Sequence, residues 1–121
     1  MPRGRSEIRI KRVYEPSAPS DGRRILVDRL WPRGVTKADA DVDYWARHAA
    51  PSDNLRKWYR HDPAKWSDFR DRYFAELDAN PEAVAELSAE LSGGTVTFLF
   101  ATRETELNNA TALREYFESR S

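Results

Sequence analysis

The chain has 121 residues, with 20 basic and 20 acidic side chains that leave no formal net charge at neutral pH. This balance provides no general attraction for nucleic acid, and the lack of cysteine excludes disulfides, thiolate metal sites and a cysteine nucleophile. The length and a hydrophobic content of 40% predict a single folded domain over residues 1–121.

The N-terminal segment is basic but carries no sign of export. No apolar segment follows it, as one would in a secretory leader, and no apolar run reaches the roughly 20 residues that cross a bilayer. We therefore expect a cytoplasmic protein with no membrane partner. The basic residues of this first segment are Arg3, Arg5, Arg9, Lys11 and Arg12.

Two strands are predicted in the first 30 residues. Ile8, Ile10 and Val13 nearly alternate with basic residues, a pattern that indicates a strand near a sheet edge with one solvated face. Residues 15–22 contain two prolines and an Asp-Gly pair, so a connector is expected there. The apolar run 25–30 then indicates a buried strand of the parallel kind.

Helices are predicted for the middle of the chain. Thr36, followed three residues later by Asp39, resembles a capping box and predicts a helix from about Lys37 to His48. A shorter helical piece is expected around residues 55–59. Two longer helices are expected after Asp62-Pro63 and Asn80-Pro81, with apolar stripes formed by Trp66, Phe69, Tyr73 and Leu77 and by Val84, Leu87 and Leu91.

The strongest strand signal is the β-branched and aromatic run from Thr95 to Ala101. A polar loop separates it from a last amphipathic helix through Ala110, Leu113 and Phe117. Long helical crossovers between strands favour parallel pairing. We predict an α/β fold in which a small parallel or mixed sheet of about three strands is covered by about five helices.

Polar loops follow two of these strands, and ligands of open α/β sheets bind beyond the carboxyl ends of the strands. The loops run from Asp28 to Gly34 and from Thr102 to Asn109. We therefore predict that they face each other across one ligand site.

Asp28 and Arg29 end an apolar strand, so one of the two side chains is expected to point into poorly solvated space. A buried Asp28 would either form a structural ion pair with an arginine or act as a general base or hydroxyl acceptor. Glu104, on the second loop, is the other candidate acid/base residue.

The corner formed by Trp31, Pro32, Arg33 and Gly34 is stiff, because proline restricts its own φ. An arginine fork on a stiff corner suits phosphate or carboxylate, although Arg33 can equally be solvated. Trp31 can stack on a ring or simply cover the core. The candidate anion ligands are Arg29, Arg33 and Arg103.

Asn108 and Asn109 can cap the final helix or bind a ligand near its free amides. His61 lies beside Asp62 at a predicted helix start, where a histidine can be an acid/base group near neutral pH or a packing residue. With two histidines and no HExxH spacing, we expect no metal site and no cofactor.

Four segments together resemble one known family. They read IKRVYEP, DGRRILVDRLWPRG, APSDNLRKWYRHDPAKW and ATRETELNNA, and they are similar to the YeaO-like branch of the domain-of-unknown-function 488 (DUF488) family. The resemblance implies a small α/β fold and brings no established activity. Relatives in this branch read close to His-Asn-Asn-Ala where this chain has Leu107 to Ala110, so the resemblance also implies that a loop imidazole is missing here.

Three functions from different classes remain open at this point. The first is a small enzyme or binder acting on an anionic molecule, such as a nucleotide or a phosphorylated metabolite, at the strand-end loops. The alternative is a nucleic-acid-associated or regulatory module that uses the basic first segment and Trp31 without catalysis. A structural domain with an ion-paired interior is the third.

Overall fold

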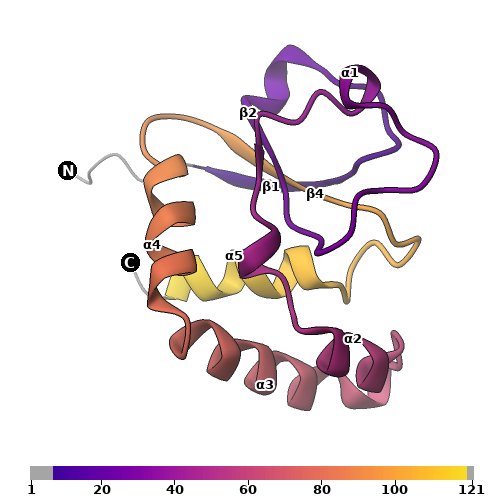
Figure 1. The fold of residues 1–121 in the computed structure, drawn as a ribbon, viewed down its shortest axis with the longest axis vertical. Coiled ribbons are helices and arrows are strands. Elements are labelled where there is room, and N and C mark those ends of the chain that lie inside the picture. The colour runs from indigo at the N-terminus through magenta and orange to yellow at the C-terminus, as the bar shows by residue number, and fades with distance from the viewer. Residues whose placement is uncertain (1–6, 120–121) are drawn as a thin grey trace.

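The computed structural model of the chain describes residues 7–119, in which four strands form one sheet with only parallel neighbours (Figure 1). The order of the strands across the sheet is β1-β4-β2-β3. The strands are β1 (Ile8–Arg12), β2 (Arg23–Leu26), β3 (Tyr44–Trp45) and β4 (Val96–Phe100). The α-helices are α1 (Lys37–Ala40), α2 (Asp53–Tyr59), α3 (Trp66–Asp78), α4 (Pro81–Glu90) and α5 (Asn109–Ser119), and single 3₁₀ turns cover Pro19–Asp21, Arg47–Ala49 and Pro63–Lys65.

The predicted α/β class is confirmed, with four strands instead of about three. The additional strand is β3, which pairs with β2 through only two residues. The strongest predicted strand is the central one, β4, and all five of its residues are buried. Both of its edges are paired, with β1 and β2, and its two faces pack into the two cores, Phe98 and Phe100 into one and Leu99 into the other, which explains why its sequence is so apolar.

The predicted helix from Lys37 to His48 is wrong beyond its first turn. Thr36 caps α1 as expected, but the helix ends at Ala40, and its C-cap residue Asp41 has a left-handed φ of 51°. Two residues later, the amide of Asp43 donates to the carbonyl of Arg24 and its carboxylate accepts from the Arg24 amide, both at 2.8 Å. This pairing begins β3 beside β2, so contacts with a distant strand override the local helical pattern.

The two faces of the sheet carry different cores. Helix α5 packs on β1 and β4 and lies between the sheet and α3 (Figure 1). The predicted stripe of α3 contributes Phe69, Tyr73 and Leu77 to this larger core, where all three are buried. The opposite face holds a smaller cluster around Leu26 and Leu99, which α1 and the loop after β2 cover. None of the helices within residues 7–119 has the length and apolar content needed to cross a membrane.

A buried ion pair joins the start of β2 to the smaller core. Arg24 is 2% exposed and Asp21 5% exposed, and their side chains form a salt bridge that Lys11 extends at 3.1 Å. Burial raises the pKa of Asp21, but hydrogen bonds from the Ala18 amide, Lys11 and Arg24 outweigh it and leave the pKa below its ordinary value. The ionised form of Asp21 is therefore part of the folded structure.

Candidate functional site

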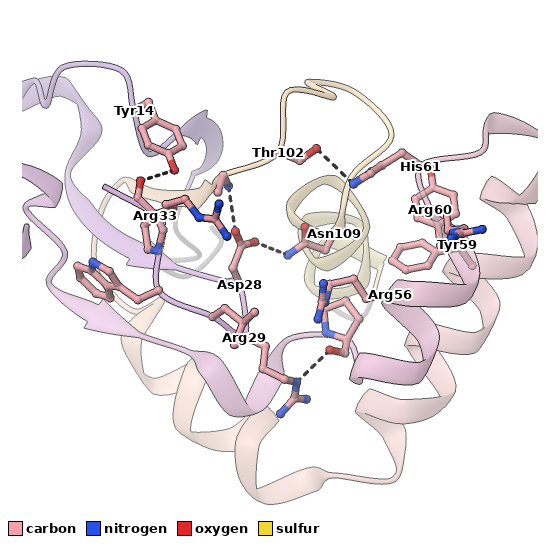
Figure 2. A pocket seen from close by; sticks show the side chains of 16 residues that line it. Tyr14, Asp28, Arg29, Arg33, Arg56, Tyr59, Arg60, His61, Thr102 and Asn109 are labelled. Atoms are coloured by element: carbon pink, nitrogen blue, oxygen red, sulfur yellow. Dashed lines mark hydrogen bonds between the residues drawn. The ribbon is translucent and has the colours of Figure 1, made fainter. Parts of the chain in front are cut away.

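The carboxyl ends of β2 and β4 open onto a cavity of about 500 Å³. The loop after β2 supplies residues 28–33, and the end of β4 supplies Ala101 and Thr102. Asn109, the first residue of α5, lines the cavity between them, and α2 with its C-terminal turn forms the opposite wall (Figure 2). The structure thus brings both loops that the sequence places after strands to one cavity, whose volume is typical of small-molecule sites.

Asp28 lies at the centre of this cavity (Figure 2). One carboxylate oxygen accepts a hydrogen bond from the Asn109 side chain at 3.0 Å, and the other accepts one from the Ala101 amide at 2.9 Å. No arginine within residues 7–119 forms a salt bridge with it, so these two amides, and not an ion pair, hold the carboxylate. Burial raises the pKa of Asp28, and the two hydrogen bonds together with the charges of Arg56 and His61 oppose that rise.

Arg29 and Arg33 line the same cavity but differ in what their guanidinium groups do. Arg29 donates to the carbonyls of Ala50 and Pro51, at 3.1 and 3.2 Å, and so anchors the chain that leads into α2. Arg33 is exposed, and among the described residues its guanidinium has no hydrogen-bond partner. Its backbone carbonyl accepts from the Tyr14 hydroxyl at 2.8 Å, which holds the loop while the side chain extends towards the cavity (Figure 2).

The opposite wall carries two arginines that sequence reasoning missed. Arg56 and Arg60 are four residues apart, and both line the cavity, Arg56 from α2 and Arg60 from the C-cap position of that helix. Arg56 donates to the exposed Asp53 at 3.0 Å, and Arg60 caps the helix with a left-handed φ of 50°. His61 is also left-handed, with a φ of 57°, and its Nε2 lies 3.3 Å from the Thr102 hydroxyl across the cavity mouth. The four-residue spacing was the available sequence signal.

Aromatic and apolar side chains line the cavity beside the loop that follows β2. Trp31 donates from its indole nitrogen to the Val35 carbonyl at 2.7 Å and packs edge-on against Trp45, so it covers the smaller core while also lining the cavity. Tyr14 and Leu30 line the cavity as well and are the exposed large hydrophobic residues of the described chain, at 44% and 62%. Tyr14 and Leu30 were not predicted as site residues from the sequence.

Glu104 and Arg103 do not line the cavity. The Glu104 carboxylate accepts from the amides of Leu107 and Glu106, at 2.9 and 3.0 Å. These hydrogen bonds lower the pKa of Glu104. Glu104 therefore stabilises the conformation of its own loop. Arg103, the preceding residue, is exposed. The two candidate acid/base residues, Asp28 and Glu104, are not brought together.

Asn108 is fully buried and also lies outside the cavity lining. Its side-chain oxygen accepts from the Thr111 amide at 3.0 Å, and its side-chain nitrogen donates to the Glu104 carbonyl at 2.8 Å. It therefore caps α5, one of the two roles open to it.

At Leu107, where the resemblance implied a missing imidazole, the backbone carbonyl accepts from the Tyr59 hydroxyl at 2.8 Å. Burial raises the pKa of Tyr59 to about 12.

The basic residues of the first segment are engaged elsewhere. Arg9 and Lys11 each form an ion pair with a carboxylate, and Arg12 donates to two carbonyls of the loop after β4. Arg3 and Arg5 lie outside the described residues.

Within residues 7–119, no group of three or more histidine, cysteine, aspartate or glutamate residues is arranged to hold a metal ion.

The charges that line the cavity are unequal. Four arginines and one carboxylate belong to its lining, so the cavity carries three more positive than negative charges with His61 neutral. The chain as a whole has no net charge. The excess is therefore a local property of this cavity.

A family model described as the inactive DUF488-N3 subclade matches residues 7–121. The uncharacterized protein Rv3073c of Mycobacterium tuberculosis is 40% identical over 115 residues, which cover 95% of this chain and 97% of the relative. The uncharacterized protein YeaO of Escherichia coli is 38% identical over 112 residues, which cover 93% of this chain and 97% of that protein. No solved structure matches this chain.

Proposed function

The chain belongs to the DUF488 family, and we propose that its strand-end cavity binds a small anionic molecule, such as a nucleotide or a phosphorylated metabolite, without transforming it. The observation that carries the proposal is the lining of four arginines and one carboxylate in a chain of zero net charge. Arginine forks match the oxygen pairs of phosphate groups, and Arg33 and Arg60 have no side-chain partner among residues 7–119 to compete with a ligand.

Ring-bearing phosphates fit the cavity better than a bare anion. Tyr14 and Leu30 present exposed apolar surface at one wall, and Trp31 lines the same side. Arg56 and Arg60 lie on the other wall (Figure 2). A molecule with an apolar ring at one end and a phosphate at the other would satisfy both walls at once.

The placement of the carboxylates favours binding without turnover over catalysis. Glu104 is held by the amides of its own loop and does not line the cavity, so Asp28 is the one carboxylate available there among the described residues. A general acid/base mechanism commonly uses two positioned groups, and the Nε2 of His61, the other acid/base candidate in the lining, lies 3.3 Å from the Thr102 hydroxyl. The description of the matching subclade as inactive agrees with this interpretation.

The test compares arginines inside and outside the cavity. Titration calorimetry with adenosine monophosphate should show saturable binding to the wild type, and Arg33→Ala and Arg60→Ala should each weaken it about tenfold or more, because a hydrogen bond to a charged group contributes about 1.5–3 kcal/mol. Arg103→Ala removes the same charge from the exposed loop outside the cavity and should leave the affinity unchanged.

Two results would contradict the cavity as the anion site. One is the absence of binding by nucleotides and sugar phosphates to the wild type, and the other is an equal loss of affinity in Arg33→Ala and Arg103→Ala. Retention on DNA with a steep salt dependence would favour the nucleic-acid-associated module instead, since phosphate-backbone contacts weaken steeply as salt rises.

A further inference from the structure

We propose that Asp28 determines which anions the cavity accepts: its carboxylate takes a hydrogen bond from a hydroxyl of the ligand, so the cavity prefers ribonucleotides over phosphates that lack a hydroxyl. This inference rests on the proposed anion site and adds a selection rule to it. Asp28 lies between the two walls of the cavity (Figure 2), where a group joining a ring to a phosphate would be placed.

The carboxylate of Asp28 has unused hydrogen-bonding capacity. An ionised carboxylate offers about four acceptor positions. Among the described residues, Asn109 occupies one position on the first oxygen and the Ala101 amide occupies one on the second. The other acceptor positions of the Asp28 carboxylate have no partner among the described residues. Because Asp28 lines the cavity, a donor group of a bound molecule can reach them.

The neighbouring arginines do not fill these positions. The Arg29 guanidinium donates to the carbonyls of Ala50 and Pro51, and Arg56 donates to Asp53. Asp28 takes part in none of the salt bridges within residues 7–119. Its acceptor capacity is therefore left for a bound molecule.

The position of the carboxylate is held by two different elements. Asn109 belongs to the first turn of α5 and also donates to the Val27 carbonyl at 2.9 Å. Ala101 directly follows β4. Because the end of the central strand and the start of a packed helix both hold Asp28, its acceptor atoms are pre-organised, which is what selectivity requires.

A carboxylate inside an anion site also acts against the wrong ligand. A phosphate drawn into the cavity by the arginines approaches Asp28, and two like charges a few ångströms apart repel each other. A hydroxyl next to the phosphate removes this penalty by donating to the carboxylate. Asp28 therefore favours hydroxylated phosphates and disfavours bare ones, which is selection by attraction and repulsion together.

The first experiment changes only the ligand. Titration calorimetry of the wild-type chain compares adenosine monophosphate with dideoxyadenosine monophosphate, which keeps the base and the phosphate but lacks both ribose hydroxyls, and with sulfate, an anion that carries no hydroxyl at neutral pH. Adenosine monophosphate should bind at least about tenfold more tightly than the dideoxy compound. Sulfate should bind more weakly than either.

The second experiment changes Asp28. In Asp28→Asn the repulsive charge is absent, so sulfate should bind this variant more tightly than it binds the wild type, and the preference for adenosine monophosphate over the dideoxy compound should fall towards onefold. Glu106→Gln removes an exposed negative charge outside the cavity lining and should keep the wild-type preference. A merely structural role of Asp28 would weaken all three ligands alike.

The outcomes separate the two proposals. If none of the three compounds binds, the proposed anion site is wrong and the selection rule is wrong with it. If adenosine monophosphate and the dideoxy compound bind equally well to the wild type, the anion site stands and the role of Asp28 is refuted. This second result needs no variant, so it remains decisive even if Asp28→Asn does not fold.

Discussion

Arg24→Ala is expected to lower the free energy of unfolding by about 3–5 kcal/mol, the usual effect of removing one partner from a buried ion pair. The Arg24 side chain is almost completely buried and donates to the Asp21 carboxylate and to the carbonyls of Ala40 and Asp41. Its truncation removes the donor to the Ala40 and Asp41 carbonyls and leaves Asp21 with only Lys11 and the Ala18 amide among its side-chain partners in the described residues. Urea unfolding followed by circular dichroism measures the loss.

A double variant separates the charge effect from the loss of packing. Asp21→Asn combined with Arg24→Met removes both charges and keeps most of the buried volume, so it should lose less stability than Arg24→Ala alone. If the double variant is as unstable as Arg24→Ala, the unpaired charge is not the cause.

The same ion pair predicts a pH dependence. The pKa of Asp21 in the folded chain lies below its ordinary value of 3.8. Its contribution to stability is therefore fully present above that value and is lost as the pH falls through the folded pKa. Because Arg24→Met removes one of the groups that lower the pKa, it should make the loss of stability below about pH 4 shallower. A curve as steep as that of the wild type would contradict the assignment.

Gly22→Ala is expected to lower the free energy of unfolding by about 2–6 kcal/mol. Gly22 has a φ of 65°, and a Cβ atom built on it would lie 2.1 Å from the carbonyl oxygen of Thr95. Backbone strain of this kind costs about 1–3 kcal/mol, and overpacking costs about 1–3 kcal/mol more. Arg23, the next residue, donates its amide to the same carbonyl at 3.0 Å, so relief of the clash must disturb the pairing of β2 with β4.

Gly93→Ala is the matched control for this prediction. Gly93 also has a positive φ, 86°, but a Cβ atom there would meet nothing within 4 Å. It should show only the strain of about 1–3 kcal/mol. Equal unfolding midpoints in urea for Gly22→Ala and Gly93→Ala would show that the Thr95 contact is not the cause.

The site depends on how α2 is placed against the ends of the strands. Arg29 anchors the chain leading into α2 by donating to the carbonyls of Ala50 and Pro51. The Tyr59 hydroxyl, at the end of α2, donates to the Leu107 carbonyl. These contacts hold Arg56 and Arg60 opposite the β2 loop, so Arg29 and Tyr59, whose polar groups donate to backbone carbonyls of the chain, determine the geometry of the proposed anion site.

Sequence reasoning predicted the place of the cavity but only part of its lining. Asp28, Arg29, Trp31, Arg33, His61 and Asn109 were predicted and line the cavity. Arg103, Glu104 and Asn108 were predicted and do not. A loop sequence shows that a residue is polar, but the direction of its side chain depends on whether nearby amides capture it, as Leu107 and Glu106 capture Glu104.

The sequence by itself determined the α/β class and the end of the sheet at which the cavity lies, and it restricted the sheet to parallel or mixed pairing. Apolar runs and long crossovers are local properties, and they restrict the topology before any distant contact forms. Only the tertiary structure decided that α1 is short and that α2 provides the second cationic wall. Both outcomes depend on pairs far apart in the chain, Asp43 with Arg24 and Tyr59 with Leu107, whose hydrogen bonds outweigh local propensity.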